Sequence, residues 1–174
     1  MWALEAASEL QAGIVVVHPG YGPWILGHKF DEWLARAEKY LIMLVEHAAS
    51  LDLKIAFENI YDSGPFDLAK LLSVINHQNA GICLDIGHFN VFCRNHKLSE
   101  WCELLGKKIF ELHLHDNDGT ADQHIAPGDG KIDYLPLIEW YKSLTADSRP
   151  ILTLELPHRT HVIKAARILK EWFF

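Results

Sequence analysis

The sequence predicts an α/β fold built on a parallel sheet. Short apolar runs rich in β-branched residues alternate with longer segments whose apolar residues recur at helical spacing. Single helices between successive strands imply right-handed crossovers, which make neighbouring strands parallel. Two folds fit this pattern, an open doubly wound sheet and a (β/α) barrel. An open nucleotide-binding sheet usually has a Gly-rich turn after its first strand, and the sequence contains no GxGxxG or Walker A pattern.

Five apolar runs are the predicted strands. The first is all-apolar and β-branched, which is typical of a strand buried on both faces. The predicted ranges are 13–17, 54–57, 81–84, 109–114 and 151–154. A short extended piece near His124 brings the expected number of strands to about six.

Helices are predicted between these strands. Segments 30–50 and 66–76 have stripes of apolar residues with a period of 3.6. The other predicted helices are 1–11, 99–106, 133–144 and 160–172. Short polar side chains accept hydrogen bonds from free backbone N–H groups, so Ser99, Asp133 and Thr160 are the expected N-caps of the last three. A polar, Gly-rich loop is expected over 115–131.

Length and composition indicate one globular domain. The 174 residues are 49% hydrophobic and 22% charged, and the net charge of −7 argues against broad nucleic-acid binding. The apolar runs are shorter than the roughly 18 residues that a membrane span needs. The start of the chain does not resemble a signal peptide. Cys83, Cys93 and Cys102 are odd in number and form no CxxC, which favours free thiols in a reducing cytoplasm.

The carboxyl end of each predicted strand carries His, Glu or Asp, either as a residue of the strand or directly after it. These residues are, in chain order, His18, Glu58, Asp85, His113 and Glu155. In a (β/α) barrel the carboxyl ends of all strands converge on the face that holds the active site. Mixed imidazole and carboxylate ligands suit Zn²⁺, Mn²⁺ or Fe²⁺. The strand ends therefore predict a divalent-metal site.

Further polar residues lie near these ends. His88 follows Asp85 by three residues and is either a metal or substrate contact or a structural histidine. Asp122 and His124 would point the same way in an extended segment, and they are either ligands or part of a solvated loop. His115 and Asp116 are expected to orient the ligands rather than to bind the metal.

The motifs around these residues resemble the xylose-isomerase-like (β/α)8 superfamily. This superfamily contains sugar isomerases and epimerases together with endonuclease IV, of apurinic endonuclease family 2. The motifs are VHPG, FEN, LDIGH, HLHD, DQH with PGDG, and LE, in family order between Val17 and Glu155. The resemblance implies a TIM-type (β/α) barrel, and the family barrel has two βα units before the strand that ends in His-Pro-Gly. Only one helix precedes that strand here, so we expect a single domain over 1–174 that lacks the first two βα units and carries about six of eight strands.

For the sugar enzymes, the resemblance implies one divalent metal, either Mn, Zn or Mg. Its ligands would be Glu58, Asp85, His113 and Glu155. Glu58 and Glu155 would also be the catalytic pair that moves a proton on and off the carbon next to a carbonyl. His88 would orient a hydroxyl of the small carbohydrate or sugar phosphate substrate.

For endonuclease IV, the resemblance implies three zinc ions and a metal-bound hydroxide that attacks DNA beside an abasic sugar. A further His ligand of that enzyme belongs to the missing part of the barrel. The positions that match its ligands are His18, Glu58, Asp85, His88, His113, Asp122, His124 and Glu155.

Charge favours the sugar enzyme, because a DNA enzyme must neutralise several phosphates. Loop 116–122 contains no Lys or Arg. The sparse basic residues near the predicted mouth are Lys29, Arg94, Lys97, Lys131 and Arg159. A non-enzyme is the third hypothesis, either an inactive truncated barrel or a subunit completed by a partner. An open arc of strands leaves bare edges, which favours a homo-oligomer.

Overall fold

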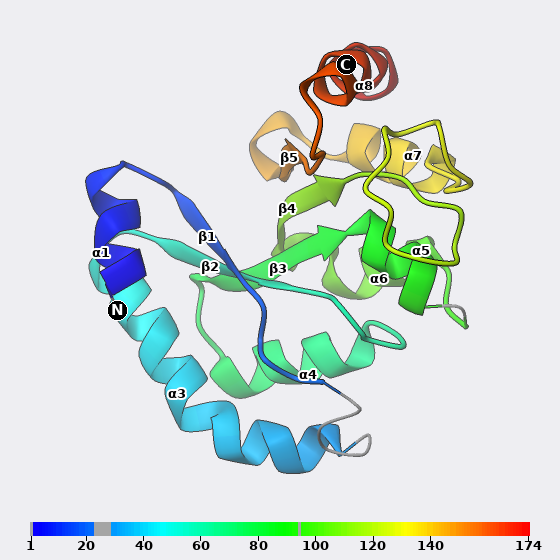
Figure 1. Cartoon of the computed structure of the whole chain (residues 1–174). Helices are drawn as coiled ribbons and strands as arrows, with labels where there is room; N and C mark the ends of the chain where they lie inside the picture. The colour runs from blue at the N-terminus through cyan, green and yellow to red at the C-terminus, as the bar shows by residue number, and fades with distance from the viewer. Residues whose placement is uncertain (1, 23–28, 94) are drawn as a thin grey trace.

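One parallel sheet organises the computed structural model, which describes residues 2–22, 29–93 and 95–174 (Figure 1). The strand order equals the chain order, and each strand pairs in parallel with the next. The strands are β1 (Ile14–Val17), β2 (Lys54–Glu58), β3 (Ala80–Asp85), β4 (Ile109–Leu114) and β5 (Ile151–Leu154). The sheet curls into a half-barrel, so the predicted α/β fold and incomplete TIM-type barrel are confirmed.

Helices connect the strands and wind around the outside of the curled sheet (Figure 1). Helix α3 contacts α4, and α6 contacts α7, so neighbouring crossovers support one another. The helices are α1 (Trp2–Glu9), α3 (Phe30–Ser50), α4 (Phe66–Ile75), α5 (Ile86–Phe92), α6 (Leu98–Leu105), α7 (Leu135–Ser143) and α8 (Arg159–Phe173), with single 3₁₀ turns at Gly106–Lys108 and Ala146–Ser148.

Burial follows position in the sheet. All of β3 and most of β2 are buried, because each has a strand on both sides and a helix on its outer face. By contrast, β1 is only partly buried along its whole length, so its expected burial on both faces is wrong. Strands β1 and β5 are the edges of the described sheet, and Ile151 on β5 is 53% exposed.

The segment near His124 is not a sixth strand of the described sheet. It makes an isolated antiparallel bridge between Asp116 and Ile125. His124 has φ +48°, which interrupts extended backbone. A short helix, α5, follows β3 directly and was not predicted, because its residues 86–92 include β-branched, aromatic and Gly residues that are weak helix formers.

None of the three expected residues is the N-cap of its helix, so these expectations are wrong. Helix α6 begins at buried Leu98, one residue before Ser99, and has no side-chain cap. Helix α8 begins at Arg159, one residue before Thr160, because its first turn closes on the carbonyl of His158. Helix α7 begins at Leu135 and its N-cap is Tyr134 rather than Asp133, although the carboxylate of Asp133 accepts the N–H of Leu135 at 3.1 Å.

Among the described helices, none has the length and apolar character needed to cross a membrane. The three cysteines are buried free thiols.

Candidate metal centre

The imidazole of His113 lies at the centre of three carboxylates. Its Nδ1 is 3.2 Å from Glu58 Oε1, 3.5 Å from Glu155 Oε2 and 3.8 Å from Asp85 Oδ2. One ligand atom from each of the four residues lies within 4.8 Å of the others. The four predicted ligands, which come from four separate strands, are therefore brought together.

Strand geometry explains this convergence. Glu58 and Asp85 end β2 and β3, and Asp85 is directly opposite His113 in the β3–β4 register. Glu155 follows β5 and donates its backbone N–H to the carbonyl of Leu114. Because parallel strands deliver their carboxyl ends to one face, side chains far apart in sequence meet there. Glu58, Asp85 and His113 are buried, whereas the Glu155 side chain is 43% exposed and lies at the mouth.

The donor set fits a divalent cation. Within the described chain, every ion pair of Glu58, Asp85 and Glu155 is with a histidine, and none is with Lys or Arg. Buried carboxylates need a partner for their charge. The buried Oε2 of Glu155 has no hydrogen-bond partner among the described residues. Three carboxylates and one imidazole form a mixed O/N set that suits Zn²⁺ or Mn²⁺.

Asp85 is held by donors from three directions. Its Oδ1 accepts the backbone N–H of His88 at 2.6 Å and so caps α5. Nε2 of His115 lies 3.1 and 3.0 Å from Oδ1 and Oδ2. The side chain of Asn59 bonds the backbone N–H and carbonyl of Asp85 at 2.8 and 3.0 Å. Burial raises the pKa of Asp85, but hydrogen bonding and charge from His115 and His88 outweigh it, so this pKa lies below its ordinary value.

A second group of ligands adjoins the first. Nε2 of His88 and Nε2 of His124 lie 3.3 and 2.9 Å from the same oxygen, Asp122 Oδ2. The Nδ1–H of His88 donates to the carbonyl of Asn59, and that of His124 donates to the carbonyl of Glu155, each at 2.9 Å. A neutral imidazole has one proton, so both Nε2 atoms then present lone pairs to a carboxylate oxygen. This arrangement calls for a cation at that point, either protons on the rings or a metal ion.

Electrostatics agree with a positive charge on this group. Burial lowers the pKa of His124, but its bond to the carbonyl of Glu155 and the charge of Asp122 outweigh burial and raise the pKa above its ordinary value. Asp122 and His124 were expected to point the same way from an extended segment. They do contact each other, although the backbone at His124 is left-handed rather than extended.

His18 joins the cluster from the edge strand. Its Nε2 lies 3.0 Å from Glu58 Oε2, the oxygen that faces away from His113. The His18 side chain is 62% exposed, so it is the most open of the predicted site residues.

The two residues expected to orient ligands have different surroundings. The His115 ring is fully buried between Asp85 and the stacked ring of His124, at a centroid distance of 3.9 Å. Asp116 instead organises the loop, because its carboxylate accepts the backbone N–H groups of Asn117, Gly128 and Ile132 at 2.8–3.2 Å. His115 therefore contacts the cluster directly, and Asp116 shapes the loop that carries Asp122 and His124.

Sequence reasoning missed the far side of the His113 ring. Glu111 Oε1 lies 3.5 Å from His113 Nε2, and the hydroxyl of Thr153 donates to the same Glu111 oxygen at 2.6 Å. Cys83, opposite Glu111 in the register, is a further polar group beside the His113 ring. Glu111 precedes His113 by two residues, and that spacing places both on one face of a strand. This spacing was the available signal.

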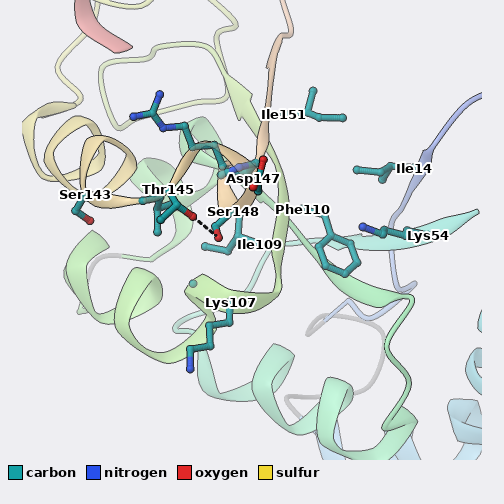
Figure 2. A pocket seen from close by; sticks show the side chains of 14 residues that line it. Ile14, Lys54, Lys107, Ile109, Phe110, Ser143, Thr145, Asp147, Ser148 and Ile151 are labelled. Carbon is teal, nitrogen blue, oxygen red and sulfur yellow. Dashed lines mark hydrogen bonds between the residues drawn. The ribbon is translucent and has the colours of Figure 1, made fainter. Parts of the chain in front are cut away.

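One hollow lies away from these residues, at the amino ends of the strands (Figure 2). It measures about 790 Å³, and both Ile14 and Ile151, from the two edge strands, line it. A smaller hollow of about 430 Å³ is lined by His124 and Glu155 at the site. We place the functional site at the smaller hollow, because the titratable cluster opens there and active sites of this architecture lie at the carboxyl ends of strands.

Basic residues near the site are few. Lys29 is paired with Glu32 at 3.0 Å, and Arg94 lies outside the described residues. Loop 116–122 contains no Lys or Arg.

Several curated proteins and solved structures are similar to this chain. It is 32% identical to the uncharacterized protein MJ1311 of Methanocaldococcus jannaschii over 98% of its own length, and 25% identical to fructoselysine 3-epimerase of Escherichia coli O157:H7 over 82%. The chain spans 59% and 51% of these relatives. Two crystal structures superpose on 98% of the chain and match over 65% of their own lengths. They are a D-tagatose 3-epimerase-like protein (TM-score 0.85, 32% identity) and the TTHB071 protein from Thermus thermophilus soaked with ZnCl2 (TM-score 0.78, 26% identity).

A family model described as a xylose isomerase-like TIM barrel matches residues 1–173. This match covers all five strands and both groups of ligands. The chain therefore belongs to the xylose isomerase-like TIM-barrel family.

Proposed function

We propose that this chain is the catalytic part of a divalent-metal-dependent sugar epimerase or isomerase. The observation that carries the proposal is the convergence of Glu58, Asp85, His113 and Glu155, with one ligand atom from each within 4.8 Å of the others. The 3-epimerase named among its relatives and the epimerase-like solved structure support a carbohydrate substrate. The zinc-soaked neighbour supports a divalent metal.

The four clustered residues would hold the metal, which is Mn²⁺, Zn²⁺ or Mg²⁺. When bound, such an ion polarises the carbonyl and adjacent hydroxyl of the substrate, which acidifies the C–H bond beside the carbonyl. Glu58 and Glu155 flank His113 at 3.2 and 3.5 Å, so each carboxylate reaches the same small space.

The Glu pair would move the proton. Glu155, exposed at the mouth, removes the proton from the carbon next to the carbonyl, and the electron pair of that C–H bond passes into an enediolate. Glu58, at the buried end of the site, returns a proton to the opposite face of the same carbon, which inverts its configuration. His88 lies 3.6 Å from Glu58 Oε1 and is placed to orient a substrate hydroxyl.

Hydrogen exchange tests this function. The protein, loaded with Mn²⁺ or Zn²⁺, is incubated in D2O with D-tagatose, D-fructose, D-allulose and fructoselysine, and deuterium at the carbon beside the carbonyl is followed by NMR. We expect deuterium incorporation and the C3 epimer for one of these ketoses. Glu155→Gln should abolish both while the fold survives, and Glu103→Gln on the exposed face of α6 is the control. Normal turnover by Glu155→Gln would exclude Glu155 as the base.

A second candidate function is a zinc-dependent phosphodiesterase of the endonuclease IV type. It is favoured by the second group of ligands, in which His88 and His124 meet on Asp122, together with the contact of His18 with Glu58. These contacts would hold up to three zinc ions, and the substrate would then be DNA with an abasic site. Cleavage of an abasic oligonucleotide by zinc-loaded protein, lost in Asp122→Asn, would favour this function over the epimerase.

We also propose that the open edges of the half-barrel are covered in the working protein. Strands β1 and β5 are apolar and only partly buried in the described structure. We propose that either two further βα units of a longer polypeptide or a second copy of this chain packs against these edges, since uncovered strand edges favour pairing. Light scattering on a size-exclusion column separates a dimer from a monomer.

A further inference from the structure

Glu111 is a sheltered carboxylate that the proposed proton transfer does not use. It lies in the middle of β4, and its side chain is 12% exposed. Its described ion pair is with His113, and no Lys or Arg is paired with it in the part of the chain that the structure covers. A carboxylate in such a place needs a hydrogen-bond donor. Thr153 supplies one, and the His113 ring, at 3.5 Å, lies at the outer limit of hydrogen-bond distance and is the candidate for a second.

The candidate donor is the ring of His113. Glu111 Oε1 lies 3.5 Å from His113 Nε2, and both side chains leave the same face of β4 because they are two residues apart. The opposite nitrogen, Nδ1, faces the three carboxylates of the metal centre. The imidazole therefore stands between Glu111 on one side and the proposed ligands on the other.

The other donor is the hydroxyl of Thr153, which lies 2.6 Å from the same oxygen of Glu111. Thr153 is the register partner of His113 on β5, so it fixes Glu111 from the neighbouring strand. Cys83, the register partner of Glu111 on β3, is the other polar group beside this ring. Three adjacent strands thus contribute to a polar layer directly beneath the metal centre.

We propose that Glu111, oriented by Thr153, is a positioning residue that sets the tautomer of His113. The Nε2–H group of His113 donates to Glu111, and this leaves the Nδ1 lone pair directed at the space between Glu58, Asp85 and Glu155. A carboxylate behind a histidine ligand fixes the ring orientation and strengthens the nitrogen as a ligand. The inference rests on the proposed function, because it assumes that His113 binds the metal.

Metal binding by folded variants tests this role without reference to turnover. Co²⁺ affinity is measured by competition with a chromophoric chelator, and the Co²⁺ absorption spectrum reports the ligand geometry. We expect Glu111→Met to bind Co²⁺ about 10–100-fold more weakly than the unaltered protein, with a changed spectrum. Glu111→Gln, which keeps an acceptor oxygen, should recover most of the affinity. Glu103→Met on the exposed face of α6 is the matched control.

The tautomer itself is read by long-range ¹H–¹⁵N NMR of the histidine rings in zinc-loaded protein. The His113 signals are assigned because they disappear in His113→Asn. We expect the His113 ring to carry its proton on Nε2 in the unaltered protein. In Glu111→Met we expect a mixture of the two tautomers. Unchanged Co²⁺ affinity and spectrum in Glu111→Met would overturn the proposal, as would a proton on Nδ1. If Cys83→Ala weakens Co²⁺ binding and Glu111→Met does not, the thiol holds the ring and the proposal is wrong. Tight Co²⁺ binding without epimerisation would instead refute the proposed function alone.

Discussion

The imidazole of His115 and the carboxylate of Asp85 are both fully buried, with Nε2 3.0 and 3.1 Å from the two carboxylate oxygens. Asp85 is a proposed metal ligand, and His115 also stacks on His124 of the second group. His115 therefore contacts both groups of proposed ligands. Its hydrogen bond to Asp85 fixes the orientation of that carboxylate.

Substitutions at His115 can distinguish how much its hydrogen bond to Asp85 and how much the packing of its ring contribute to the stability of the fold. His115→Phe retains a buried ring but leaves Asp85 without this donor, and breaking a buried charged hydrogen bond costs about 3 kcal/mol. We expect that loss in the free energy of unfolding measured in urea. His115→Gln places an amide N–H near the position of Nε2 and should regain at least half. Equal stability of His115→Phe and the unaltered protein would contradict this role.

Gly87 makes room for the His115 ring. A Cβ at position 87 would lie 1.9 Å from His115 Cε1, and Gly87 lies in helix α5, where alanine is otherwise favoured by about 1 kcal/mol. We expect Gly87→Ala to destabilise the protein by about 3 kcal/mol in the same urea assay, because the ring must shift.

Gly13→Ala is the matched control for this clash. A Cβ at position 13 meets no atom within 4 Å, so the substitution should change stability by less than about 0.5 kcal/mol. If both glycine variants are equally stable, the tight packing of His115 against Gly87 is wrong.

The carboxylate of Asp116 should control the order of the following loop. It accepts backbone N–H groups of Gly128 and Ile132, which lie 12 and 16 residues further on. In Asp116→Ala these N–H groups lose their acceptor, so hydrogen exchange of both amides should rise at least 10-fold. Exchange in the buried strand β3 should stay unchanged, since Asp116 does not support it. Uniformly faster exchange would instead indicate a general loss of stability.

Asp62 gives stability a predictable pH dependence. Burial raises its pKa from an ordinary 3.8 to about 6, against the opposing bond from the N–H of Ile60 and with a further rise from the charge of Asp67. The folded state thus binds this proton more tightly than the unfolded state. Stability falls as the pH rises from about 4 to about 6, and above that range the charged carboxylate destabilises the fold by about 1–3 kcal/mol.

Asp62→Asn should remove this effect, because an amide oxygen can still accept the N–H of Ile60 without carrying charge. Urea unfolding at pH 7.5 should show the variant to be more stable, whereas at pH 4 the two proteins should differ little. A variant that is less stable at both pH values would show that Asp62 is needed as a carboxylate.

The convergence of the proposed ligands could be predicted from sequence because a simple rule places them. Glu58, Asp85 and Glu155 lie at or just past the ends of apolar runs, and parallel strands bring such ends together. Their mutual distances depend on strand register and curl, which no local pattern specifies. Which side chains meet was therefore easier to predict than the distances between them.

Other features depend on tertiary contacts that composition does not reveal. Glu111 lies within a strand, where an acidic residue usually indicates a solvent-facing side. Its two-residue spacing from His113 places both on one face, but the contacts with neighbouring strands are what show that this face points inward. His124 has a left-handed backbone without being Gly, held by its bond to the carbonyl of Glu155. The start of α6 follows the burial of Leu98 rather than the capping preference of Ser99.

Metal analysis per chain, by mass spectrometry after gel filtration, tests the central claim most directly. We predict one tightly bound Mn²⁺ or Zn²⁺ per chain, lost in His113→Gln and retained in Asp122→Asn, because Asp122 is outside the four-residue cluster. Three zinc ions per chain would favour the phosphodiesterase instead. Retention of the metal by His113→Gln would contradict the proposed centre.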